Sequence, residues 1–320
     1  MTAGDLSIVM LTKNGGEVFK DVLAGLFACD GILDTEVLVI DSGSSDRTLE
    51  YAKRYPAIRI HQIPSSEFGH GRTRNLGARM TTRPIIVYLV QDATPAAPDL
   101  LTRLATPFDD RDFAGTFGRQ LPRAATNRIE QMFLERNYPD RHEVRAYSDK
   151  GGLGIRSIFF SNVCSAIRRD IWERIPFDES LIMCEDQLWA KQVLLAGYRT
   201  LYEPGAVVLH SHNYGLKEIF KRNFDFGVAL AGITDDTFAH MASYELQHLA
   251  SCVKELAGSG GLWWCPYFLA YEATRTTAFA MGQRAHLLPR RVRRMLSLHK
   301  YYWEDDQPAT GSTGNETADH

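Results

Sequence analysis

The chain has 320 residues, 44% hydrophobic and 23% charged, which is typical of a globular protein with a sizeable core. Lys and Arg total 36 against 39 for Asp and Glu, so charge gives no reason to expect nucleic acid as a partner. The five cysteines form no CxxC pair, which favours a reducing compartment. The N-terminal stretch MTAGDLSIVMLTKN lacks the features of a signal peptide, so a cytoplasmic protein is expected.

Strands and helices alternate in the N-terminal part of the chain. Short apolar runs predict four strands, at residues 7–11, 36–40, 58–62 and 84–90. Helical spacing predicts helices at 18–27, from Ser45 or Asp46 to Tyr55, and within FGHGRTRNLGARM. Apolar strands separated by helices predict an α/β fold with a mostly parallel central sheet flanked by helices. Ligands of such sheets bind beyond the carboxyl ends of the strands.

The rest of the chain is less regular. Residues 123–157 are polar and Arg-rich, which favours helix and loop near the site. Further strands are predicted at 158–166, 200–203 and 206–209, and CEDQLWAKQVLLAG predicts a helix that Gly197 ends. The pattern is helical from Leu216 to about Leu298. We therefore expect three parts: a domain at 1–230, a helical C-terminal region at 231–303 and a disordered tail at 304–320.

Polar side chains follow the first two predicted strands. Thr12 and Asn14 come after the first, and Asp41 comes directly after the second. A carboxylate can accept a hydrogen bond from a pyrimidine N–H, so this group could bind a nucleobase. The alternative is that DSGSSD only caps the next helix, which we favour for Ser44, Ser45 and Asp46 but not for Asp41.

A second group lies at the predicted helix start FGHGRTRN. Glycines beside basic side chains, here His70, Gly71 and Arg74, suit an anion because free N–H groups point at it. The glycine spacing does not match a dinucleotide fingerprint. A flexible turn with solvated arginines is the alternative.

Asp92 ends the fourth strand, and His212 follows the last one. A divalent cation that bridges two phosphates needs only one or two protein ligands, and this pair is chemically adequate. His210 alternates with His212, so we expect only one of them to face the site. Core or surface histidines are the alternative.

Glu185 and Asp186 begin a predicted helix, where acids are also stabilised by the helix dipole. A general base for a hydroxyl nucleophile needs an exposed carboxylate, and spacing alone does not choose between the two. Glu185 and Trp189 are expected on the acceptor side of the site.

The order of these motifs resembles that of the family-two inverting glycosyltransferases. The matching strings are SIVMLTKN, EVLVIDSGSSDRT, GRTRNLG, the acid after the fourth strand and CEDQLWAKQVLLAGY. These enzymes have the nucleotide-diphospho-sugar transferase fold called GT-A. The fuller strings FGHGRTRNLG, VYLVQDATP, FGRQLP, FFSNVCSAIRR and HSHNYGLKEIFKRNFDFG are similar to the rhamnosyltransferase branch. The resemblance covers about residues 5–230.

The resemblance implies a role for most of these residues. Asp92 would lie at the metal–diphosphate position, with Mg²⁺ or Mn²⁺ as cofactor, and Asp186 would deprotonate the acceptor hydroxyl. The family's DxD motif usually offers two acids, but here the triplet is Val90-Gln91-Asp92, so metal binding rests on Asp92 with His212. The residues expected to hold the nucleotide or its diphosphate are Thr12, Asn14, Asp41, His70, Gly71, Arg74, Gln91 and Arg222.

The same resemblance makes dTDP-rhamnose the expected donor and a glycan or lipid-linked glycan the expected acceptor, in cell-surface polysaccharide or O-antigen synthesis. A UDP-sugar donor is the first alternative. A sugar-nucleotide nucleotidyltransferase is the second, but such enzymes usually carry a basic glycine-rich loop after the first strand, and TKNGGE offers only Lys13. A non-catalytic binding module would not need Asp92 and Asp186.

The C-terminal region has a basic, aromatic composition. Pro266, Glu272 and Arg275 interrupt the apolar stretch at 262–281 and argue against a transmembrane helix. Seven Lys or Arg and no acid lie between Arg275 and Lys300, which suits contact with the inner face of an anionic membrane. The same helices could instead form a homodimer interface or pack as an ordinary terminal helix.

Overall fold

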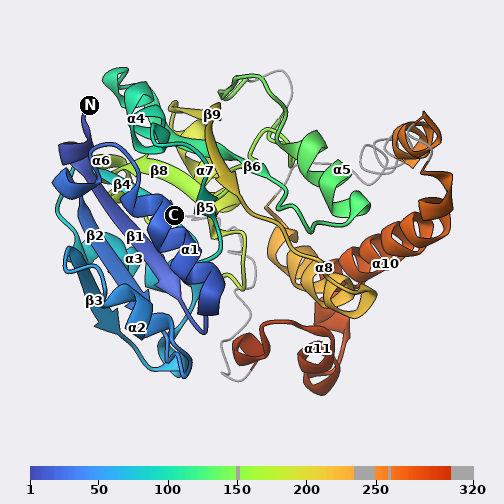
Figure 1. Cartoon of the computed structure of the whole chain (residues 1–320). Coiled ribbons are helices and arrows are strands. Elements are labelled where there is room, and N and C mark those ends of the chain that lie inside the picture. Colours follow the sequence, from blue (N-terminus) through green and yellow to red (C-terminus); the bar gives the residue numbers. More distant parts are fainter. Residues whose placement is uncertain (149–151, 234–248, 259–260, 304–320) are drawn as a thin grey trace, which may run out of the picture.

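A mixed sheet of nine strands forms the centre of the computed structural model, which describes residues 1–148, 152–233, 249–258 and 261–303 (Figure 1). The strand order is β3-β2-β1-β4-β8-β6-β9-β5, and β7 pairs with β9. The strands are β1 (Leu6–Thr12), β2 (Glu36–Asp41), β3 (Ile58–Gln62), β4 (Ile85–Leu89), β5 (Thr94–Pro95), β6 (Phe113–Leu121), β7 (Glu143–Arg145), β8 (Cys164–Arg168) and β9 (Arg199–Leu209).

The first four strands form the parallel half of the sheet. β1 pairs in parallel with both β2 and β4, and β2 pairs in parallel with β3. β8 runs antiparallel to both β4 and β6, while β6 and β9 are parallel. Thr12 of β1 lies opposite Asp41 of β2, so the two strands end at the same edge of the sheet. The sequence predicts the ligand-binding site at this edge.

Helices cover both faces of the sheet, which explains the nearly continuous apolar strands. Ile8 of β1 packs on one face and Val9 on the other. The described α-helices include α1 (Gly16–Phe27), α2 (Thr48–Ala52), α3 (His70–Met80), α4 (Leu100–Ala105), α5 (Arg128–Asn137), α6 (Arg169–Trp172), α7 (Glu185–Leu195), α8 (Leu216–Leu230), α10 (Cys265–Gln283) and α11 (Arg290–Leu296). Side chains of α1, α2 and α4 pack on the Ile8 face, and those of α3, α6 and α7 pack on the Val9 face.

The sheet differs from the sequence prediction in several places: β5 and β7 were not predicted, and the strands predicted at 200–203 and 206–209 form the single strand β9. The strand expected at 158–166 is found at Cys164–Arg168, because Ile158 and Phe160 are buried in loop conformation and not in a strand. Strand β6 was not predicted. It contains Gly118, whose absent side chain leaves room for the carbonyl of Ala206 on β9. Glycine within a strand weakens the usual strand pattern.

The C-terminal helices pack on α8 (Figure 1). α8 and α10 approach closely at two glycines: a Cβ on Gly227 would collide with the carbonyl of Phe279, and a Cβ on Gly282 with that of Phe224. The helical pattern predicted from Leu216 is therefore found in α8, α10 and α11, while 234–248 and the tail at 304–320 lie outside the described residues. Among the helices that the structure describes, none is both long and apolar enough to cross a membrane.

Candidate active site

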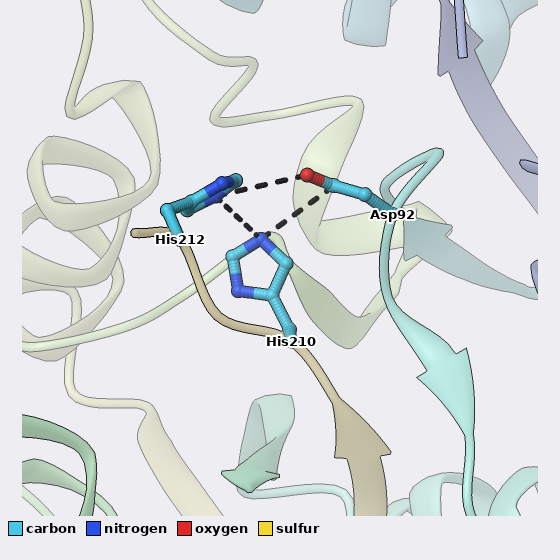
Figure 2. Close-up of side chains that lie close together, drawn as sticks. All are labelled: Asp92, His210 and His212. Carbon is cyan, nitrogen blue, oxygen red and sulfur yellow. Dashed lines mark hydrogen bonds and ion pairs between the residues drawn. The ribbon is translucent and has the colours of Figure 1, made fainter. Parts of the chain in front are cut away.

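Three side chains with metal-ligating atoms meet where β4 and β9 end (Figure 2). Asp92 Oδ1 lies 3.5 Å from His210 Nε2, and Asp92 Oδ2 lies 3.7 Å from His212 Nε2. The two Nε2 atoms are 3.1 Å apart, and all three ligand atoms lie within 4.8 Å of one another. The structure thus brings together Asp92 and His212, the two predicted ligands, and adds His210.

The prediction that only one of the two histidines faces this point is wrong. β9 ends at Leu209, so both histidines lie beyond the strand, where side chains need not alternate. The His210 backbone N–H donates to the carbonyl of Leu121 at 3.0 Å. The His212 ring stacks on Tyr214 with centroids 4.7 Å apart.

The charge state of this Asp92–His210–His212 cluster suits a cation. Burial opposes charge on Asp92, but the nearby imidazoles of His210 and His212 outweigh burial and lower the pKa of the carboxyl. Burial, with His210 beside it, lowers the pKa of His212 to about 4. At neutral pH the cluster therefore offers an ionised carboxylate and a neutral imidazole on His212, a donor set that fits Mn²⁺ or Mg²⁺ shared with a diphosphate.

Asp186 begins α7 with a carboxylate held by backbone N–H groups. Its Oδ2 accepts from Asn162 at 3.0 Å and its Oδ1 accepts from Gln187 at 2.9 Å. Burial, followed by the negative charge of Glu185, raises the pKa of Asp186 to about 7. The residue as a whole is partly exposed. A carboxylate with a pKa near neutrality is suited to accept a proton from a hydroxyl.

Glu185 has a different environment from its neighbour. It forms a buried ion pair with Arg74 of α3, so it does not face an acceptor as expected. Burial alone would raise its pKa, but Arg74 and His70 lower it. Glu185 is therefore an ionised, buried residue whose charge acts on Asp186. The structure therefore distinguishes Glu185 from Asp186, which the sequence spacing alone could not do.

The start of α3, predicted to bind an anion, is packed against protein. A Cβ on Gly71 would collide with the carbonyl of Asp178, so this glycine allows close packing of the helix. His70 Nε2 lies 3.2 Å from His299 Nε2, and burial lowers the pKa of His70 to about 4. With Arg74 paired to Glu185, all three residues predicted here have partners within the chain.

Asp41 is fully buried and organises the turn after β2. Its carboxylate accepts from Thr12 Oγ1 at 3.1 Å, from Ser44 Oγ, and from two backbone amides of the turn. Asn14 Oδ1 accepts from the backbone of Ser45 at 2.8 Å and joins the turns after β1 and β2. The structure brings Thr12, Asn14 and Asp41 together, and the Asp41 carboxylate already accepts hydrogen bonds from Thr12 and from the turn.

Gln91 joins the ends of β1 and β4. Its amide oxygen accepts from the Lys13 backbone N–H at 2.8 Å and its nitrogen donates to the Lys13 carbonyl at 3.2 Å. Arg222 of α8 lies over the ring of Tyr214, with its guanidinium carbon 5.6 Å from the centroid. Because Tyr214 also stacks on His212, this cation lies beside the metal-ligating cluster.

Trp189 does not line the site. Its side chain is fully buried against Phe160 and Phe177, and its ring N–H donates to the carbonyl of Ile175. The expected contact with the acceptor is wrong, because α7 turns this residue into the core.

Sequence reasoning missed two residues that shape the cluster. Gln120 contacts His210, and an Arg123 guanidinium N–H donates to the carbonyl of Asp92 at 2.6 Å. His210 could have been found from the His-x-His spacing directly after a strand. For Gln120 and Arg123 the sequence carries no comparable signal, since both contacts depend on the pairing of β6 with β9.

A model of glycosyl transferase family 2 matches residues 7–175, more than half of the chain. The chain belongs to glycosyltransferase family 2. This confirms the family that the sequence motifs indicate and the expected enzyme class, a glycosyltransferase. The matched segment contains Asp92, whereas Asp186, His210 and His212 lie beyond it.

Two curated relatives match this family-two glycosyltransferase over most of its length. It is 32% identical over 306 residues to the O-antigen chain rhamnosyltransferase RfbN of Salmonella typhimurium, covering 94% of this chain and 97% of RfbN. It is 31% identical to the O-antigen chain rhamnosyltransferase WbaN of Salmonella anatum, covering 85% of this chain and 87% of WbaN.

Solved structures confirm the GT-A fold. The mannosyltransferase PcManGT from Pyrobaculum calidifontis, solved with GDP-Man and Mn²⁺, matches with a TM-score of 0.56 at 19% identity, over 93% of this chain and 84% of that one. TarS residues 1–349 of S. aureus, solved with UDP-GlcNAc, match with a TM-score of 0.53 at 17% identity, over 91% and 83%. At such identities the likeness shows the fold alone.

Proposed function

We propose that this enzyme transfers rhamnose from dTDP-rhamnose, with inversion at the anomeric carbon, to a hydroxyl of a glycan or lipid-linked glycan in O-antigen assembly. The names of both curated relatives support the sugar and the process. One observation carries the chemistry: Asp92, His210 and His212 form a cluster of metal-ligating atoms, and the carboxylate of Asp186 at the start of α7 has a raised pKa.

The proposed reaction is an in-line displacement. Asp186 takes the proton of the acceptor hydroxyl, and that oxygen forms a bond to the anomeric carbon of the donor. The bond from this carbon to the diphosphate oxygen breaks, its electron pair leaves with the nucleoside diphosphate, and the configuration inverts. Glu185 contributes by keeping the pKa of Asp186 high enough for proton transfer near neutral pH.

The leaving diphosphate is placed at the cluster of Asp92, His210 and His212. A divalent cation, Mg²⁺ or Mn²⁺, held by these residues would offset the charge that develops on the diphosphate. Arg222 adds a fixed positive charge beside His212 and Tyr214. The nucleoside would lie along the turns of Thr12, Asn14 and Gln91, where the β1, β2 and β4 ends meet.

A donor panel tests this proposal. We expect dTDP-rhamnose to raise the melting temperature more than UDP- or GDP-sugars, only with Mn²⁺ or Mg²⁺ present, and to release dTDP slowly by hydrolysis. Stronger stabilisation by a UDP-sugar would overturn the donor assignment. No binding of any sugar nucleotide would overturn the proposed function.

We also propose that the C-terminal helices contact an anionic membrane surface on the cytoplasmic side. A groove of about 460 Å³ between α8, α10 and α11 is lined by Leu216, Phe220 and Met295, with Lys217 and Lys221 beside it. Met295 is 63% exposed. Exposed apolar side chains among cations suit the headgroup boundary of anionic lipids.

Flotation with vesicles tests the membrane proposal. We expect the protein to float with phosphatidylglycerol vesicles but not with phosphatidylcholine vesicles, and the double variant Arg291→Glu, Met295→Glu to lose flotation. Lys53→Glu, directly after α2, makes a similar charge change on another exposed surface and should float normally. Equal flotation of all three proteins, or a dimer in solution that buries this face, would contradict the proposal.

A further inference from the structure

Gln120 lies between the metal-ligating cluster and the region of the proposed base. It is the penultimate residue of β6, and only 4% of it is exposed. Its Oε1 lies 2.8 Å from His210 Nδ1. Its Nε2 lies 2.5 Å from the Tyr138 hydroxyl and 3.1 Å from Ser161 Oγ.

The structure orients the amide with its oxygen toward His210 and its nitrogen toward two hydroxyls. The amide nitrogen has two hydrogens, and the hydroxyl oxygens of Tyr138 and Ser161 lie within reach of it. In this orientation the amide oxygen can only accept, so the hydrogen between it and His210 belongs to Nδ1. With a hydrogen on Nδ1, the neutral imidazole has its lone pair on Nε2, the atom that faces Asp92 and His212.

We propose that Gln120 is a positioning residue that keeps His210 in the Nδ1–H tautomer and so presents Nε2 to a divalent cation. The inference rests on the proposed metal-dependent function. Histidine ligands of metals almost always donate their second ring N–H to a fixed acceptor, which sets ring orientation and raises ligand basicity. Here a neutral amide on a buried strand supplies that acceptor.

The same amide connects the two halves of the site. Ser161, which accepts from Gln120, precedes Asn162, whose backbone N–H donates to Asp186. A continuous path of contacts therefore runs from His210 through Gln120 to the segment that holds the proposed base. Gln120 thus fixes a cluster ligand relative to the carboxylate that activates the acceptor.

A purely structural role for Gln120 predicts a different pattern of mutant effects. If the side chain only fills space, Gln120→Leu should be tolerated and Gln120→Glu should be harmful, because it buries a charge. If the side chain must accept a hydrogen bond from His210, the order is reversed. Glutamate keeps an acceptor for Nδ1–H, and the Tyr138 and Ser161 hydroxyls can turn their hydrogens toward it, whereas leucine offers no acceptor.

Mn²⁺ titration by electron paramagnetic resonance, in the presence of dTDP, measures this order. We expect Gln120→Leu to weaken Mn²⁺ binding about 10–100-fold, the usual cost of losing an outer-shell partner, and Gln120→Glu to stay close to wild type. Ser161→Ala is the matched control, since Tyr138 still holds the amide, and it should change affinity little. Equal Mn²⁺ affinity of Gln120→Leu and wild type would overturn the inference.

A second measurement uses the metal-free protein and separates this inference from the proposed function. Imidazole ¹⁵N shifts of His210 should show the Nδ1–H tautomer in wild type and a shift toward Nε2–H in Gln120→Leu. If wild type fails to bind Mn²⁺, the proposed metal site fails, yet an Nδ1–H signal that depends on Gln120 would still support the positioning role. An Nε2–H tautomer in wild type would overturn it.

Discussion

Two sets of strand ends in this molecule carry aspartates that look alike in sequence but differ in structure. At the ends of β1 and β2, Asp41 is fully buried and accepts hydrogen bonds from Thr12, Ser44 and nearby amides. At the ends of β4 and β9, Asp92 is partly exposed and meets two imidazoles. The Asp41 carboxylate has its hydrogen-bond partners within the protein, whereas the Asp92 carboxylate is partly exposed and available to a ligand.

The largest effect is expected at the proposed base. Asp186→Asn keeps the size of the side chain but removes its capacity to accept a proton. We expect kcat to fall about 10²–10⁴-fold, the usual contribution of a general base, with donor affinity unchanged. Sugar-transfer assays measure kcat, and a separate binding titration with dTDP-rhamnose measures donor affinity. Full turnover in the variant would remove Asp186 from the mechanism.

Asp92→Asn tests metal binding at the ends of β4 and β9. It removes the only charged ligand of the cluster formed with His210 and His212. We expect Mn²⁺ affinity to drop by more than about 100-fold, since changes one shell further out already cost about 10–100-fold. The melting temperature should change little, because the side chain is partly exposed. Calorimetric titration with Mn²⁺ and dTDP checks both points, and unchanged metal binding would contradict the cluster.

The same substitution at Asp41 should give the reverse result. Asp41→Asn replaces an acceptor-only group with one whose NH₂ faces donors. We expect a loss of about 1.5–3 kcal/mol in the free energy of unfolding, the scale of a hydrogen bond to a charged group. Mn²⁺ affinity should stay near wild type. If Asp41→Asn instead has the wild-type free energy of unfolding but no longer binds the nucleotide, Asp41 contacts the base. The proposed difference between Asp41 and Asp92 would then be wrong.

A smaller effect is expected in the pH profile. The base must be deprotonated, so kcat/KM should rise with pH and level off above about 7, the pKa of Asp186. Removing the negative charge in Glu185→Gln lowers the pKa of Asp186 and should move the rising limb to lower pH. The variant leaves Arg74 without its carboxylate, so circular dichroism must show it folded at the assay temperature. If the rising limb of the kcat/KM profile does not move in Glu185→Gln, a group other than Asp186 titrates.

The parallel half of the fold was predictable because its signals are local. Strands β1 to β4 are buried on both faces, so each appears as an apolar run between polar turns, and their bounds agree within about two residues. Strand β6 depends on β8 and β9, which are distant in sequence, and its glycines weaken its own pattern. Loop residues Ile158 and Phe160 looked like a strand because they are buried.

For the site, residue types were easier to predict than contacts. Asp92 and His212 were proposed from their chemistry, and Asp186 was proposed as the base from the family resemblance. Which partners each residue has was not predictable: Arg74 binds Glu185 and His70 contacts His299, and both contacts join segments more than a hundred residues apart. His210 was excluded by a strand rule that does not apply beyond Leu209.

Crystals grown with Mn²⁺ and dTDP, measured at the manganese absorption edge, would show directly whether the proposed metal site exists. We predict an anomalous peak from a manganese ion bound to Asp92, His210 Nε2 and His212 Nε2, with diphosphate oxygens completing its coordination. An ordered nucleotide without manganese at these three residues, or manganese bound only elsewhere, would contradict this prediction.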